Sequence, residues 1–179
     1  MAKIGLKYLV VKPEAGTGVN MAKMIQADVA INMAKVKLYA DDSVAESDTS
    51  FQDGTLSLNI SDLSESMQTA VLGHKKVGTT EEIASNVDDE APYVGAGFYG
   101  VKMVNNVKKW RALWFPKIQF TEPGESMATK AETLAFGTDT IVGDIHIDVS
   151  GNWKFEQTFT TEAAAVTYLN GKAGIVVIP

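Results

Sequence analysis

Apolar and polar residues alternate along much of the chain with a period of two, the pattern of β-strands that bury one face. In the stretch TLSLNI, for example, Leu56, Leu58 and Ile60 alternate with Thr, Ser and Asn. We therefore expect a mainly β (α+β) chain with strands over residues 4–12, 29–38, 55–60, 93–104, 107–120, 131–149 (with a break at Gly143) and 152–159.

Within the second of these strands the alternation changes parity. Apolar residues occupy odd positions from Val29 to Met33 and even positions at Val36 and Leu38. One extra residue in a strand restores the two faces of a sheet, so we expect a bulge or tight turn near residues 34–35.

The strands over residues 93–104 and 107–120 are rich in β-branched and aromatic residues and are separated by Asn105 and Asn106. Asn tolerates the positive φ that two-residue hairpin turns require. We therefore expect an antiparallel hairpin that turns at these two asparagines.

This hairpin explains the segment GAGFYG, residues 95–100, which has the G-x-G-x-x-G spacing of a dinucleotide-binding turn. Such a turn needs a helix directly behind it, whereas here a second strand follows. In the hairpin register Gly97 lies across from Trp114, and the missing side chain leaves room for the indole. We interpret Gly97 and Gly100 as structural glycines and expect no nucleotide cofactor.

Two stretches have the spacing and caps of helices. SDLSESMQTAVLGH predicts a short helix from about Ser64 to Leu72, stopped by the glycine that follows. TTEAAAVTYLNG predicts a second helix that is capped by Thr160 or Thr161 and ends at Gly171.

The length and composition of the chain exclude or disfavour several classes of function. The 179 residues suit one domain, and the net charge of −6 disfavours stable binding of nucleic acid or anionic membranes. The chain has no cysteine, which excludes disulfides, thiolate nucleophiles and cysteine zinc sites. The N-terminal residues resemble neither a signal peptide nor a membrane span, so we expect folding in a cytoplasm without a membrane anchor.

Few side chains suggest catalytic or metal chemistry. Asp144, His146 and Asp148 share one face of an expected strand and could hold a metal ion, but the solvated face of an amphipathic strand is the more common reason for this pattern. The acidic run at residues 88–90 lacks the ligand spacing of a calcium loop. We therefore expect a protein that is not an enzyme and has no cofactor or metal.

The distribution of charged residues suggests a subunit interface instead of a catalytic or metal site. The acidic stretch YADDSVAESDTSFQDG, residues 39–54, predicts a long exposed loop, and the hairpin register places Lys102 directly opposite Lys109. Opposed like charges are mildly destabilising, so an acidic segment should lie over them. Our hypothesis is a subunit interface in which a second copy brings an acidic loop to a basic hairpin; its residues are Asp41, Asp42, Glu46, Asp48, Lys102, Lys109 and Arg111.

Several segments occur in an order that resembles the major tail proteins of long, non-contractile bacteriophage tails. They are LYADDSVAESDTSFQDGTLSLNISDLS, then VLGH, then DDEAPYVGAGFYGVKMVNNVKKWRALWFPKIQF, and finally WKFEQTFTTEAAAVTYLN. The resemblance covers roughly residues 26–172, and it depends on the ordered series because no single motif would suffice.

The resemblance implies a β-sandwich or barrel-like tail-tube fold with two short helices and long interface loops. It implies a virion protein, made in the bacterial host cytoplasm, that forms stacked hexameric rings through which DNA passes during ejection without being held. Implied partners are other copies of the chain and the tail-tip or initiator, tape-measure and tail-terminator proteins. Residues 1–25 and 172–179 would be arms of a single domain over residues 1–179.

The alternative is a free β-sandwich module that binds carbohydrate or a host surface protein. Tyr93, Tyr99, Trp110 and Trp114 would then form an aromatic platform. Against this, both tryptophans fall on the same apolar face as Val101, where core packing is the more common use.

Overall fold

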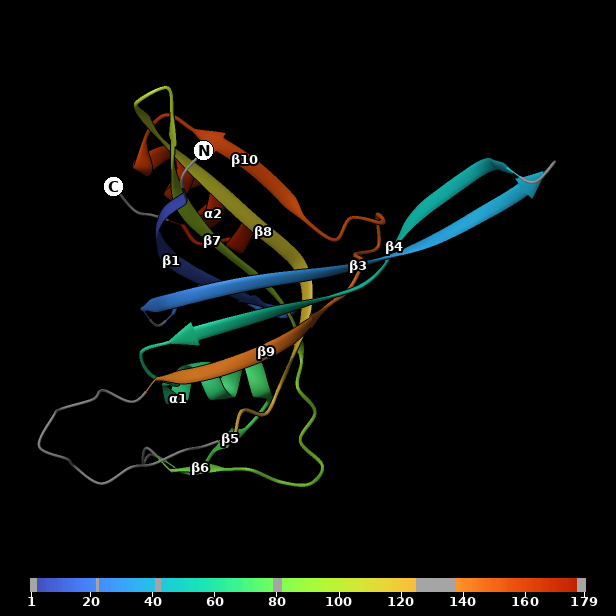
Figure 1. Cartoon of the computed structure of the whole chain (residues 1–179). Helices are drawn as coiled ribbons and strands as arrows, with labels where there is room; N and C mark the ends of the chain where they lie inside the picture. Colours follow the sequence, from blue (N-terminus) through green and yellow to red (C-terminus); the bar gives the residue numbers. More distant parts are fainter. Residues whose placement is uncertain (1–2, 22, 41–42, 79–81, 125–137, 177–179) are drawn as a thin grey trace, which may run out of the picture.

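A computed structural model describes residues 3–21, 23–40, 43–78, 82–124 and 138–176. The fold is mainly β, as the alternation predicted. Its large antiparallel sheet has the strand order β2-β1-β7-β8-β9-β4-β3, and β10 also pairs with β8 (Figure 1). These strands are β1 (Lys3–Pro13), β2 (Val19–Asn20), β3 (Met24–Ala40), β4 (Ser43–Ile60), β7 (Tyr93–Val104), β8 (Val107–Thr121), β9 (Asp139–Ile145) and β10 (Phe155–Phe159).

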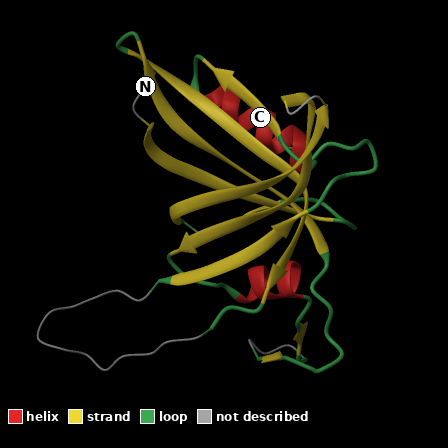
Figure 2. Ribbon diagram, turned by 45° about the vertical axis from the view of Figure 1, so that its right-hand side comes forward, coloured by secondary structure: helices red, strands yellow, loops and turns green. Residues whose placement is uncertain are grey.

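The sheet curls without closing into a barrel (Figure 2). Curling brings β1 near β3, but among the described residues these two strands form no ladder. A small second sheet pairs β5 (Lys75–Lys76) with β6 (Ile83–Ala84).

The predicted hairpin is confirmed as β7 and β8. Asn105 and Asn106 have φ of 50° and 62°, which matches the two-residue turn expected for them. The register places Val104 opposite Val107 and Gly97 opposite Trp114. The turn therefore sets the pairing of β7 with β8 from Ala96 to Val104.

The two faces of this hairpin belong to two separate apolar clusters. Phe98 and Phe115 lie on one face, packed with residues of β1, β4 and β9. Tyr99 and Trp114 lie on the other, packed with helix α2 (Glu162–Ala173). Because both faces are buried away from the turn, residues 93–101 and 112–116 are almost entirely apolar.

Gly97 lies where β7 packs closely against Trp114 and α2. A Cβ at this position would lie 2.5 Å from Cε3 of Trp114, 2.9 Å from the Leu113 carbonyl and 2.9 Å from Cδ2 of Leu169. Gly100 is less crowded, because a Cβ there would meet only the Gly5 carbonyl at 3.4 Å. Close packing thus requires glycine at position 97 far more than at position 100.

Polar contacts also attach α2 to the sheet. The Tyr8 hydroxyl donates to Oδ1 of buried Asn170 at 2.8 Å, and the Tyr99 hydroxyl donates to Glu162. The Thr161 side chain accepts from the backbone N–H of Ala164 at 3.3 Å and caps the helix N-terminus.

The end predicted for α2 was wrong. The helix passes through Gly171 and stops at Gly174, whose φ is +70°. Ala173 is fully buried in the cluster beneath the helix, and its packing favours one further turn.

The other predicted helix is confirmed, with an irregular hydrogen-bond pattern. It consists of α1 (Glu65–Met67) followed by a π-helical turn, η1 (Gln68–Leu72), and Gly73 ends it with a φ of +80°. Met67, Val71 and Leu72 pack into the cluster that also holds β4.

The acidic stretch, residues 39–54, was predicted to be a loop, and this was wrong. Apart from residues 41–42, which lie outside the described chain, it belongs to a long hairpin of β3 and β4. The register shift predicted near residues 34–35 lies between Asn32 and Met33, and the extra residue is Gln52 on the partner strand.

The prediction for residues 131–149 also needs correction. Residues 131–137 lie outside the described chain, and β9 ends at Ile145. Gly143 does not break the strand: it pairs with Leu56 and Phe120, and a Cβ there would meet Cγ2 of Ile118 at 2.6 Å. The strand predicted for residues 152–159 is present but starts only at Phe155.

A matched pair of substitutions tests the packing at Gly97. Gly97→Ala should lower the free energy of unfolding by about 1–3 kcal/mol, because the added methyl group overlaps Trp114 and the Leu113 carbonyl. Gly100→Ala adds the same group and should change it by less than about 0.5 kcal/mol. Urea denaturation measures both, and equal losses at the two positions would contradict the packing role of Gly97.

Candidate functional site

The β7–β8 hairpin carries a strongly basic segment at its turn. Between Glu90 and Glu122 the sequence contains no acidic residue. The same stretch contains the cations Lys102, Lys108, Lys109, Arg111 and Lys117. Positive charge is therefore concentrated on the β7–β8 hairpin.

Arg111 is neutralised within the chain by Glu156 of β10. Its Nε and Nη2 donate to the two carboxylate oxygens at 2.7 and 2.6 Å, and Nζ of Lys154 lies 3.3 Å from the same carboxylate. The hydrogen bonds from Arg111 lower the pKa of Glu156 to about 2. Arg111 thus already has an acidic partner, which the sequence hypothesis had assigned to a second copy.

Lys102 and Lys109 are placed as the hairpin register predicted, directly opposite each other. They follow Gly100 and Arg111 along the face that bears Phe98 and Leu113, away from α2. In the described part of the chain neither lysine forms an ion pair.

Of the acidic residues named in the interface hypothesis, Glu46 and Asp48 belong to β4. Asp41 and Asp42 are outside the described residues. The backbones of Glu46 and Asp48 pair with Leu38 and Val36 in the long hairpin, so they belong to a strand instead of a loop.

This hairpin continues beyond the rest of the sheet as a two-stranded arm, which we define as residues 32–40 and 43–53; at the base of the arm Phe51 stacks on Trp153. From Gly54 to Ile60 β4 pairs with both β3 and β9, whereas the preceding residues of β4 pair with β3 alone. The arm projects away from the other strands (Figure 1). At the usual rise of a strand it is roughly 35 Å long.

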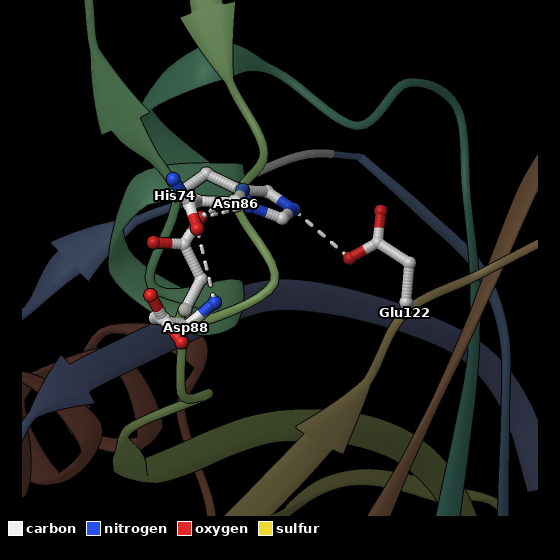
Figure 3. A network of polar contacts seen from close by, with 5 residues as sticks. His74, Asn86, Asp88 and Glu122 are labelled. Carbon is white, nitrogen blue, oxygen red and sulfur yellow. Dashed lines mark hydrogen bonds and ion pairs between the residues drawn. The ribbon is translucent and has the colours of Figure 1, made fainter.

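A second polar cluster, which sequence reasoning missed, surrounds His74. The ring is 7% exposed; its Nδ1 lies 3.3 Å from Oδ2 of Asp89 and its Nε2 lies 2.9 Å from Oε2 of Glu122 (Figure 3). The same Asp89 oxygen accepts the backbone N–H of Asn86 at 2.8 Å. Only the doubly protonated ring can donate to both carboxylates, so the geometry favours an imidazolium.

The electrostatics of this cluster agree with its geometry. Burial lowers the pKa of His74, but the hydrogen bonds and charges of Asp89 and Glu122 outweigh burial and raise that pKa above its ordinary value. The Asn86 N–H and the His74 ring hold the pKa of Asp89 below its ordinary value, with a further contribution from Lys75. The cluster ties the segment before β7 to the end of β8.

The residues considered for a metal site are only partly brought together. Asp144 and His146 line a shallow groove with Asp53 and Phe51, whereas Asp148 does not line it. Oδ1 of Asp148 accepts the backbone N–H groups of Ser150 and Asn152, each at 2.8 Å. Within the described ranges no group of three or more His, Asp or Glu side chains could hold a metal ion.

The aromatic residues of the alternative, carbohydrate-binding function do not form one exposed platform. Tyr99 and Trp114 are 2% and 4% exposed and lie beneath α2. Tyr93 packs its ring against His146, edge to face, and under the ammonium of Lys117. These side chains serve internal packing instead of presenting a flat surface.

Comparison with family models and with curated proteins finds no match to this chain. No helix in the described ranges is both long enough and apolar enough to span a membrane.

A double-mutant cycle tests the Arg111 assignment. Replacing Arg111 and Glu156 by Ala, singly and together, should give a coupling free energy of about 0.5–1 kcal/mol at neutral pH, because both side chains are partly exposed. The Glu156 pKa of about 2 lies below the ordinary 4.5, so the coupling should be lost as the pH falls from 4.5 through 2. A cycle of Lys102 with Glu156 is the control, and equal coupling in both cycles would refute the assignment.

The His74 cluster should make stability depend on pH. Because the folded-state pKa of His74 is raised above 6.5, its contribution is complete below pH 6.5 and lost as the pH rises through the folded-state pKa. Wild type should therefore exceed His74→Gln in free energy of unfolding most below pH 6.5, and His146→Gln should keep the wild-type pH dependence. Denaturation at a series of pH values tests this; a wild-type advantage that does not change with pH would contradict it.

Proposed function

We propose that this protein is the structural subunit of a bacteriophage tail tube, assembling as stacked hexameric rings through which DNA passes. The observation that carries the proposal is the two-stranded arm, residues 32–40 and 43–53, which leaves the body without a third strand in the described chain. The stacked hexameric rings are the assembly that the resemblance of the sequence to major tail proteins implies.

An isolated two-stranded ribbon is only marginally stable in water. Over a length of roughly 35 Å, such an arm needs contact with another surface to be stable. A polymer of identical subunits provides that surface in every copy, and a repeated contact between different surfaces of the subunit builds rings or tubes.

Strand β3 adds a second feature that favours assembly. It lies at the end of the strand order, and Ile25, Val29 and Met33 are 55%, 38% and 41% exposed. Such an edge pairs readily with another chain unless it is covered. In the proposed tube a neighbouring subunit covers it.

The charge of the protein is compatible with DNA passage. A net charge of −6 repels phosphate, so a tube of such subunits would conduct DNA without holding it. The proposed role involves no reaction and no cofactor.

The rival function, a free module that binds carbohydrate or a host surface protein, loses its main support because Tyr99 and Trp114 are buried. The groove lined by Phe51, Asp53 and His146 is the surface that such a module would use.

Electron microscopy of the concentrated protein tests the proposal. Wild type should form tubes or six-fold rings. In the matched variant, residues 36–48 are replaced by an Asn-Gly turn between the paired positions Lys35 and Thr49. It should keep the near-ultraviolet spectrum and melting behaviour of the body but form no tubes. A wild type that stays monomeric at every concentration and binds sugars would overturn the proposal in favour of the module.

A further inference from the structure

Opposite charges predominate on two separate hairpins, although the β3 strand of the arm also contains Lys35 and Lys37. The β7–β8 hairpin and its flanks, residues 91–121, contain cations and no acidic residue. From Leu38 to His74 the reverse holds, because this stretch has no Lys or Arg. In the described part of the arm, the acidic residues nearest its end are Glu46 and Asp48, and these form what we call its acidic end.

The structure shows which cations already have a partner. Arg111 is bound by Glu156, and the Lys117 ammonium lies 4.1 Å from the centre of the Tyr93 ring. The three lysines nearest the turn have no ion pair among the described residues: Lys102, Lys108 and Lys109.

The backbone concentrates these lysines further. Lys102 pairs with Lys109 on one side and with Lys3 of β1 on the other, so three adjacent strands have lysine at the same level of the sheet. Directly opposed like charges destabilise a sheet, and an anionic partner would remove that cost. The surface near the turn that bears Lys102 and Lys109 is here called the lysine end; Lys108, which pairs with Met103, lies on the other face.

The face that bears Lys102 and Lys109 is open to a partner. Helix α2 covers the opposite face, where Val101 pairs with Trp110. Lys102 and Lys109 are each partly exposed. The turn itself lies at one extreme of the molecule (Figure 1).

The arm of the same chain cannot easily serve as this partner. It leaves the body from the other end of the strand order and runs away from the β7–β8 turn (Figure 1). An acidic arm and a lysine end that point apart in one molecule form a self-complementary pair between molecules, as in head-to-tail association.

We propose that the lysine end of one subunit binds the acidic end of the arm of a second copy. The inference rests on the proposed tube and names one contact between its subunits. It omits Arg111 of the sequence hypothesis, since Arg111 already has an internal partner.

Charge reversal on both sides tests the contact. Lys102→Glu/Lys109→Glu keeps two like charges opposed, so the fold should persist, but self-association in sedimentation velocity should weaken by about tenfold or more. Glu46→Lys/Asp48→Lys should weaken it similarly. The chain with all four changes should recover association, because the two charges are exchanged.

The control is Lys23→Glu/Lys75→Glu, which changes net charge by the same amount at two exposed lysines. It should associate like wild type, and circular dichroism should show that every variant is folded. If the lysine-end variant associates like wild type, or the four-fold variant does not recover, the proposal is wrong.

The same measurements separate this contact from the tube itself. Tubes that are unaffected by the charge changes would leave the proposed function standing and overturn the contact. Charge-dependent association that never produces tubes or rings would support the contact and overturn the tube. Binding of duplex DNA by wild type, lost in Lys102→Glu/Lys109→Glu without any effect on association, would assign the lysine end to nucleic acid and contradict the proposal.

Discussion

The packing of Trp114 over the backbone of Gly97 is the constraint on which the rest of this structure depends. It requires a strand position without a side chain, and Leu169 of α2 completes the contact. The Asn105–Asn106 turn brings these two residues together, and the same register pairs Lys102 with Lys109 near the turn. The two-residue turn therefore places Gly97 opposite Trp114 on the face that packs against α2, and it places Lys102 opposite Lys109 on the other face.

The sequence could predict elements whose faces are buried. Alternation at Leu56, Leu58 and Ile60, and the two asparagines of the turn, carry local signals that the structure confirms. The β4 half of the arm carried no such signal, because before Phe51 it pairs with β3 alone and tolerates many polar residues. Acidic composition then resembled that of a loop. The end of α2 was misjudged for a related reason: two glycines were available, and the burial of Ala173 decided between them.

The candidate site was predictable only where it depended on the hairpin register. Lys102 and Lys109 follow from the turn, whereas the partner of Arg111 comes from β10, 45 residues along the chain. The His74 cluster joins residues separated by 15 and 48 positions. No periodicity links such residues, because their contact depends on the path of the whole sheet. Topology thus changed the interpretation of Arg111 from an interface residue to an internal ion pair.

The central claim is that the two-stranded arm is stabilised by contact between subunits. Hydrogen exchange of the backbone amides of residues 43–53, compared between dilute and concentrated protein, tests it most directly. The amides of β7 that pair with β8 provide an internal reference, since their protection comes from the folded body. The account predicts fast exchange in the arm when the protein is dilute and strong protection when it assembles, with β7 unchanged. Equal protection of the arm at all concentrations would contradict it.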